Sequence, residues 1–212
     1  MIQAELFSSP PLDLLSLERL ALGNGFQLIA GIDEAGRGPL AGPVVAAAVI
    51  LPAGLRITGV NDSKKLSPDT RERLFDTIIA QAVTVGVGMG SPELIDRINI
   101  LQATRHAMLT AVSQLDPQPD YLLIDGISTI DSPIPQKTVK KGDSLSLSIA
   151  AASIIAKVTR DRLMREMDET YPGYGFGGHK GYGSSLHMDA IRRLGPSPIH
   201  RQTFGGVKEH LS

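Results

Sequence analysis

The sequence contains no cysteine, and this absence removes several kinds of chemistry. A chain without cysteine has no disulfide framework, no thiolate zinc site and no cysteine nucleophile. Catalysis by such a protein would have to use oxygen, nitrogen or a metal ion.

Long apolar runs are missing as well. No run approaches the ~18 residues needed to span a bilayer. The first residues, MIQAELF, also lack the basic and apolar regions of a signal peptide. We therefore expect a cytoplasmic protein with no membrane partner. The 212 residues, 42% of them hydrophobic, predict a single domain.

Net charge is nearly absent, because the chain carries a formal charge of only -1. This value argues against a surface that is basic all over, but the charge is unevenly distributed. Counted from the sequence, residues 1–136 carry -6 and residues 137–212 carry +5. An acidic site facing a basic surface would suit a polyanion, although an ordinary solvated surface gives the same counts.

The hydrophobic pattern predicts an α/β protein. The predicted strands are 26–33, 44–51, 83–89, 120–125 and 136–140. The predicted helices are 12–22, 68–81, 91–115, 143–170 and 186–194, with a loop at 171–183. The first two strands are expected to be antiparallel. The strand-helix-strand order before residue 125 predicts a right-handed parallel crossover.

Four carboxylates occupy unusual positions in this pattern. Asp33 and Glu34 end an apolar strand, Asp125 ends another, and Asp143 opens the long helical stretch. Four ionised carboxylates around one point repel each other unless cations neutralise them. Because the ligands of such a cation would all be oxygen atoms, the cation would be Mg²⁺ or Mn²⁺. Two such ions could activate a water for phosphoryl displacement.

Simpler interpretations of these acids stay open at this point. Asp125 followed by Gly126 is typical of a turn, and Asp143 could be the N-cap of the following helix. In addition, adjacent strand residues point to opposite faces. Asp33 and Glu34 could share one ion only if the backbone bends after them or if Glu34 reaches the ion from the side.

Glycine-rich and basic segments are candidate contacts for an anion. The Gly36-Arg37-Gly38 run allows close backbone approach and offers a guanidinium group for phosphate, and its spacing is not that of a dinucleotide fingerprint. Lys64 and Lys65 could grip phosphate, or could simply be solvated. The 171–183 loop contains aromatic and basic residues that could contact nucleic acid, or its tyrosines could be structural.

Several motifs in order resemble the type 2 ribonucleases H, and specifically bacterial ribonuclease HII. The first is GIDEAGRGPLAGP at residues 31–43, and the similarity extends over about residues 26–207. The other motifs are NDSKKL at 61–66, NILQAT at 99–104, DG at 125–126, KGD at 141–143 with SIIAK at 153–157, KGYG at 180–183 and SPIHR at 197–201.

The resemblance implies a ribonuclease H-like fold, a mixed five-stranded sheet flanked by helices. In a single domain at 1–212, the catalytic core would be about 26–183 and a C-terminal helical extension about 184–212. It also implies that Asp33, Glu34, Asp125 and Asp143 are the catalytic, metal-binding residues. The substrate-binding residues would be Gly36, Arg37, Gly38, Lys64, Lys65, Lys180 and Tyr182.

The implied activity is hydrolysis of the RNA strand of RNA/DNA hybrids and cleavage 5′ to single ribonucleotides in duplex DNA, leaving 3′-hydroxyl and 5′-phosphate ends. In the family, the Gly-Arg-Gly backbone contacts a ribose 2′-hydroxyl and the tyrosine packs against the next deoxyribose. A monomer is expected. The two alternatives are a related integrase or structure-selective nuclease, and an inert nucleic-acid-binding protein.

Two comparisons within the resemblance refine this expectation. Ribonuclease HIII carries an extra N-terminal domain, for which residues 1–25 are too few, so ribonuclease HII is favoured. Residues 206–212 contain no aromatic pair. Recruitment by a replication clamp, which uses such a terminal peptide in some relatives, is therefore not expected.

Overall fold

The computed structural model describes residues 13–60 and 66–211. Its centre is a five-stranded sheet in the order β3-β2-β1-β4-β5. The strands are β1 (Ile29–Ala35), β2 (Val44–Ile50), β3 (Thr84–Gly90), β4 (Tyr121–Asp125) and β5 (Gln136–Val139). β1 is antiparallel to β2 and parallel to β4, so the expected mixed sheet is confirmed.

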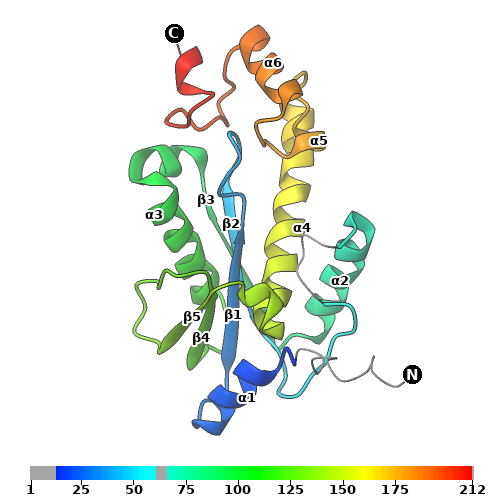
Figure 1. The fold of residues 1–212 in the computed structure, drawn as a ribbon, viewed down its shortest axis with the longest axis vertical. Helices are drawn as coiled ribbons and strands as arrows, with labels where there is room; N and C mark the ends of the chain where they lie inside the picture. The colour runs from blue at the N-terminus through cyan, green and yellow to red at the C-terminus, as the bar shows by residue number, and fades with distance from the viewer. Residues whose placement is uncertain (1–12, 61–65, 212) are drawn as a thin grey trace, which may run out of the picture.

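Helices cover both faces of this sheet (Figure 1). α3 (Pro92–Ser113) packs on one face, and α4 (Leu147–Thr170) with α2 (Pro68–Gln81) lies on the other. The remaining helices are α1 (Ser16–Gly23), α5 (Phe176–His179), α6 (Ser185–Leu194) and the 3-10 turns η2 (Gly142–Ser144) and η3 (Lys208–His210). None of the helices in the described part of the chain is long and apolar enough to cross a membrane.

The contact between β1 and α4 brings two backbones together. A Cβ atom on Gly31 would lie 2.1 Å from the carbonyl carbon of Ser148, so only glycine fits at this position. The small residues of α4, such as Ala150 to Ala152, are completely buried against the sheet. This close packing fixes the distance between α4 and β1.

Two predictions about local structure need correction. The 171–183 segment is not entirely a loop, because α5 forms within it. Asp143 is not the N-cap of α4, because it lies in η2 and the Ser146 side chain accepts the capping hydrogen bond from the Ile149 amide. The stretch predicted as helix from residue 143 therefore begins with a separate turn that contains the acid.

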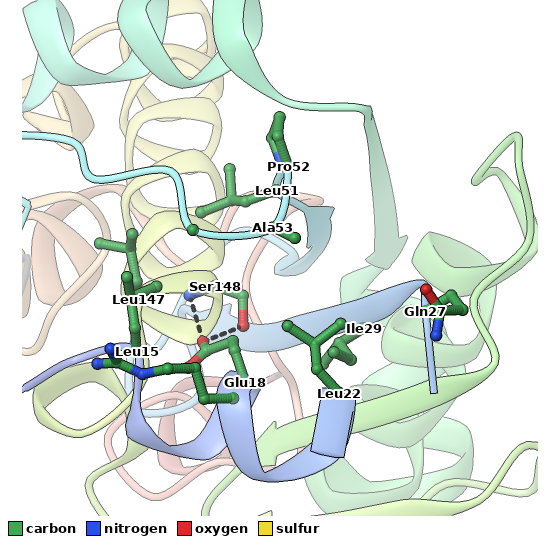
Figure 2. Close-up of a pocket in the computed structure, with 12 residues that line it drawn as sticks. Leu15, Glu18, Leu22, Gln27, Ile29, Leu51, Pro52, Ala53, Leu147 and Ser148 are labelled. Atoms are coloured by element: carbon green, nitrogen blue, oxygen red, sulfur yellow. Dashed lines mark hydrogen bonds between the residues drawn. The ribbon is translucent and has the colours of Figure 1, made fainter. Parts of the chain in front are cut away.

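α1 fixes the N-terminus of α4 through one carboxylate. Oε1 of Glu18 accepts hydrogen bonds from the Ser146 hydroxyl (2.6 Å), the Ser148 amide (3.0 Å) and the Ser148 hydroxyl (2.8 Å). Figure 2 shows Glu18 reaching from α1 to Ser148 at the start of α4. A negative group at a helix N-terminus also interacts favourably with the helix dipole.

We expect Glu18→Ala to lower the free energy of unfolding by about 1–2 kcal/mol, because three donors at the start of α4 lose their acceptor. Urea denaturation measures this loss. Glu166→Ala is the matched control, since Glu166 is an exposed residue of the same helix. Equal losses in the two variants would show that the Glu18 contact does not stabilise α4.

Candidate active site

Asp33 and Glu34 point to opposite faces of the sheet. β1 stays regularly paired through both residues, with Asp33 opposite Ala47 and Glu34 opposite Ala46. Ala47 packs in the core under α4, whereas Ala46 packs in the core under α3. Since opposed residues share a face, Asp33 faces α4 and Glu34 faces α3. The backbone does not bend between the two acids.

The flank of β1 beside Glu34 is open at the end of β4. β4 ends at Asp125, and Gly126 follows with φ of 91°, so no strand covers this flank of β1 beyond Ile32. Glu34 and Asp125 line the same cavity, together with Arg37 and residues of α3. The approach of Glu34 from the side to an ion shared with Asp33 stays a prediction.

Asp33 is held in an environment that opposes its negative charge. Its side chain is 4% exposed, and Ser153 of α4 hydrogen-bonds to it. Burial, followed by the charges of Glu34 and Asp125, raises the pKa of Asp33 well above its usual value. The Glu34 amide donates a 2.7 Å bond to Asp33 Oδ1, which offsets only part of this effect. A cation beside Asp33 would relieve the unfavourable charge.

Asp125 and Asp143 are joined by the backbone of η2. The amide of Gly142, the residue before Asp143, donates a 2.6 Å hydrogen bond to Asp125 Oδ1. Asp143 is 5% exposed, and its Oδ1 lies 3.4 Å from the Ser144 hydroxyl. The turn interpretation of Asp125 is therefore incomplete, because its side chain fixes the segment that carries the fourth acid.

The donor chemistry of these acids fits a hard divalent cation, because every candidate ligand is a carboxylate oxygen and the innermost one is buried beside two others. The evidence that the four acids come together at one point is weaker. Within residues 13–60 and 66–211, no group of three or more His, Asp or Glu side chains is close enough together to hold a metal ion. Which of the four acids bind metal therefore stays a prediction.

A groove beside the acids contains most of the predicted substrate-binding residues. It is lined by the predicted residues Gly36, Arg37, Gly38 and Tyr182, with Glu34 at its edge. Its wall is one side of α4, where Ser153, Lys157 and Arg160 recur at helical spacing. The Arg37 side chain is about half exposed and lies 3.3 Å from Glu34. Glu34 and Arg37 thus line both this groove and the cavity beside Asp125.

Arg160 supports the floor of this groove. Its side chain is 1% exposed and donates to the carbonyls of Pro43 (2.9 Å), Lys180 (3.0 Å) and Ala41 (3.1 Å). Gly36 lies directly against it, because an added Cβ would be 2.0 Å from Arg160 Nε. Burial lowers the pKa of the guanidinium group.

Arg201 supports the same loop from the C-terminal segment. This side chain is completely buried and donates to the carbonyls of Gly42 (2.9 Å), Arg37 (2.9 Å) and Gly36 (2.5 Å). Burial, together with the nearby charge of Arg160, lowers its pKa to about 9, so it stays charged at neutral pH. Two buried cations therefore fix the backbone of the Gly36–Pro43 loop.

The predicted lysines are less clearly part of the site. Lys64 and Lys65 lie outside the described residues. The ammonium group of Lys180 donates to the Gly177 carbonyl, and its partial burial lowers its pKa. Tyr182, in contrast, is 48% exposed and projects beside Gly38, where an added Cβ would be 3.7 Å from its ring.

Sequence reasoning missed the residues that support the site. Arg160, Arg201 and Ser153 carry no recognisable catalytic pattern, and their partners are far away in sequence. The only signal for Ser153 and Arg201 was their place in two of the motifs that carry the family resemblance. Their roles follow from burial and hydrogen bonding in the structure.

The chain matches a known protein family over most of its length. A sequence model described as Ribonuclease HII matches residues 30–207. The chain belongs to the ribonuclease HII family. A curated relative, the Ribonuclease HII of Pelobacter propionicus, is 70% identical over 212 residues, covering 100% of this chain and 97% of the relative.

Solved structures agree with this assignment. The ribonuclease H2 of Pyrococcus horikoshii OT3 superposes with a TM-score of 0.73 at 29% identity, covering 86% of this chain and 96% of that one. Bst-RNase HIII, crystallised in complex with Mn²⁺, has a TM-score of 0.67 at 20% identity, covering 86% of this chain and 68% of that one. The latter likeness concerns the fold alone.

Family membership establishes the class of activity. The protein is a ribonuclease H, an endonuclease that hydrolyses RNA in RNA/DNA hybrids and takes part in ribonucleotide removal. The ribonuclease HII family depends on divalent metal ions. An inert nucleic-acid-binding protein and an integrase are both disfavoured by this result.

We expect Asp33→Asn to abolish turnover and to stabilise the metal-free protein. The raised pKa means that ionising Asp33 costs folding free energy at any pH above the usual value of 3.8. Removing the charge should raise the free energy of unfolding at pH 7.5 in the presence of chelator. Thermal unfolding in EDTA measures this, with the exposed Asp131→Asn as control. A destabilised Asp33→Asn protein would contradict the prediction.

Gly36→Ala and Gly38→Ala form a second matched pair. Gly36 has φ of +96° and no room for Cβ beside Arg160, whereas a Cβ on Gly38 makes only an ordinary contact. We expect Gly36→Ala to cost about 2 kcal/mol or more and Gly38→Ala to stay within about 0.5 kcal/mol. Thermal unfolding curves of both variants measure the difference. Similar melting temperatures would show that Arg160 does not press on Gly36.

Proposed function

We propose that this protein cuts duplex DNA on the 5′ side of a single embedded ribonucleotide, as well as the RNA strand of hybrids, leaving 3′-hydroxyl and 5′-phosphate ends. The observation that supports this is the continuity of the acids with the glycine groove. Glu34 belongs to the acidic group and also lines the groove with Gly36, Gly38 and Tyr182. A strand in the groove would place its backbone beside the carboxylates.

Asp33, Glu34, Asp125 and Asp143 are the proposed holders of Mg²⁺ or Mn²⁺. Bound ions would supply an activated water and neutralise charge on the leaving oxygen. The chain's own contribution is to fix the carboxylates. Ser153 and the Glu34 amide orient Asp33, and the Gly142 amide orients Asp125. The buried position of Asp33 also excludes water from one side of the acidic group.

The loop of Gly36, Arg37 and Gly38 is the proposed reader of the ribose 2′-hydroxyl. This hydroxyl is the one group that distinguishes RNA from DNA at a given nucleotide. A backbone reader must be rigid to detect one oxygen. The carbonyls of Gly36 and Arg37 are bound by Arg201, which supports that rigidity. Tyr182, exposed beside Gly38, would pack against the adjacent deoxyribose.

The basic residues would contribute backbone phosphate contacts. Arg37 is exposed enough to contact phosphate bidentately. Lys180 would first have to leave the Gly177 carbonyl, and Lys64 and Lys65 remain proposed on sequence alone. The proposal also includes a single domain at 1–212, a monomeric state and a cytoplasmic location. The location is proposed because chromosomal DNA lies in the cytoplasm of the bacteria that hold the curated relatives.

The decisive experiment compares three duplexes in Mg²⁺ or Mn²⁺: one with a single ribonucleotide, an all-DNA control and an RNA/DNA hybrid. We expect a cut only 5′ to the ribonucleotide in the first, none in the second and multiple cuts in the third. End-labelled products with 3′-hydroxyl ends complete the test. Cutting the all-DNA duplex as efficiently would overturn the proposal.

We expect Arg37→Ala to weaken binding of the ribonucleotide duplex and to reduce the salt dependence of binding. Loss of one phosphate contact lowers the slope of log K against log salt by about 1. Binding isotherms at four salt concentrations measure the slope in Ca²⁺, which is used to prevent turnover. Arg97→Ala is the control, since Arg97 is exposed on α3. An unchanged slope for Arg37→Ala would remove it from the phosphate contacts.

A further inference from the structure

Three histidines near Tyr182 have no part in the proposed reaction. His187 of α6 and His200 of the C-terminal segment are buried, and His179 of α5 stacks on His187 with ring centroids 4.4 Å apart. They occupy the end of the molecule where α5 and α6 meet the C-terminal segment (Figure 1). Their contacts indicate a structural role.

Hydrogen bonds assign one tautomer to each imidazole of the buried pair. The Ser197 amide donates to His200 Nδ1 at 2.8 Å, so this nitrogen accepts and the His200 proton is on Nε2. His200 Nε2 lies 3.0 Å from His187 Nε2 and must donate to it. The His187 proton is then on Nδ1, which donates to the Tyr182 carbonyl at 2.9 Å.

These bonds form a directional relay from Ser197 through His200 and His187 to Tyr182. Each donor in the relay has an acceptor only while both imidazoles are neutral, because a further proton would place two N–H groups against each other. Burial lowers the pKa of both rings, that of His200 to about 4. The relay is therefore intact at neutral pH.

The surroundings of the relay keep it in this state. His179 accepts from the Gly181 amide at 3.1 Å and contacts the Tyr174 carbonyl at 2.9 Å through its other nitrogen, so it too is neutral. The rings of Tyr174 and Phe176 pack on His200. Arg160 of α4 and Arg201, which directly follows His200, are both bound to backbone carbonyls.

The relay connects the two parts of the proposed substrate groove. At one end, it binds the carbonyl of Tyr182, whose ring lies beside Gly38. At the other end, His200 pairs by a backbone bridge with Ala41 in the Gly36–Pro43 loop. The Leu40 amide donates to the Gly181 carbonyl at 2.8 Å, which joins the two segments a second time.

We propose that His187 is a positioning residue for substrate recognition, because its neutral imidazole fixes the backbone of Tyr182 relative to the glycine loop. This inference rests on the proposed role of Tyr182 in binding the deoxyribose next to the ribonucleotide. His187 touches no substrate and acts through Tyr182 alone. Its loss should affect binding of the duplex and leave the hydrolytic step unchanged.

Two amide substitutions separate the two nitrogens of His187. In His187→Asn the amide nitrogen takes the place of Nδ1 and can still donate to the Tyr182 carbonyl. In His187→Gln the amide takes the place of Nε2, and the carbonyl loses its donor. We expect KM for the ribonucleotide duplex to rise about fivefold in His187→Gln and to stay within about twofold in His187→Asn, with kcat nearly unchanged in both.

A double-mutant cycle with Tyr182 identifies the path of the effect. Tyr182→Ala alone should raise KM by about tenfold. Adding His187→Gln to Tyr182→Ala should raise KM no further, because the ring that His187 positions is already absent. Additive effects would overturn the proposal, as would equal KM values for the Asn and Gln variants. His106→Asn, an exposed histidine of α3, is the control and should behave as the wild type.

The cycle also separates failure of this inference from failure of the proposed function. An unchanged KM in Tyr182→Ala would remove Tyr182 from substrate binding, and the role of His187 would fall with it. A raised KM in Tyr182→Ala with no effect of His187→Gln would overturn the role of His187 alone.

Nitrogen NMR of the wild-type imidazoles tests the relay without activity. At pH 6.5 we expect neutral rings with the proton on Nδ1 of His187 and on Nε2 of His200. A cationic ring in the pair, or a proton on Nδ1 of His200, would overturn the relay whether or not the variants fold.

Discussion

The candidate site depends on two buried guanidinium groups that are bound by backbone carbonyls. Arg160 and Arg201 approach the Gly36–Pro43 loop from different elements and donate to the carbonyls of several of its residues. Burying such a charge without hydrogen bonds would cost several kcal/mol, so the loop must keep a conformation that supplies all of these acceptors. A glycine-rich segment that would otherwise be mobile is thereby given a single conformation.

The sheet could be predicted from sequence because its strands are strongly apolar and are separated by glycine, proline and amphipathic helices. The carboxylates were also recognisable, since acids at strand ends interrupt that pattern. The divergence of Asp33 and Glu34 followed from strand alternation, and pairing with Ala47 and Ala46 confirms it. Sequence patterns were sufficient wherever a feature depends on residues that are close together in the sequence.

The supporting contacts could not be predicted in the same way. Arg201 donates to carbonyls, which every residue possesses, so no partner type appears in the sequence. The true cap of α4, Ser146, stands three residues after the acid that was considered for that role. Glu18 reaches Ser148 from 130 positions away. Such contacts depend on the finished packing of β1 against α4 and leave no periodic signal.

The position of Arg201 near the C-terminal end has a consequence for synthesis of the protein. Its hydrogen bonds to Gly42 join residues 159 positions apart. A chain emerging from the ribosome presents β1, β4 and α4 well before Arg201, and domains begin to fold from the N-terminal side. The acidic group and Arg160 can therefore assemble while the hydrogen bonds from Arg201 to the loop are still missing. A chain that ends before Arg201 would hold this loop through Arg160 alone, so the last part of the chain to be synthesised completes the loop's support.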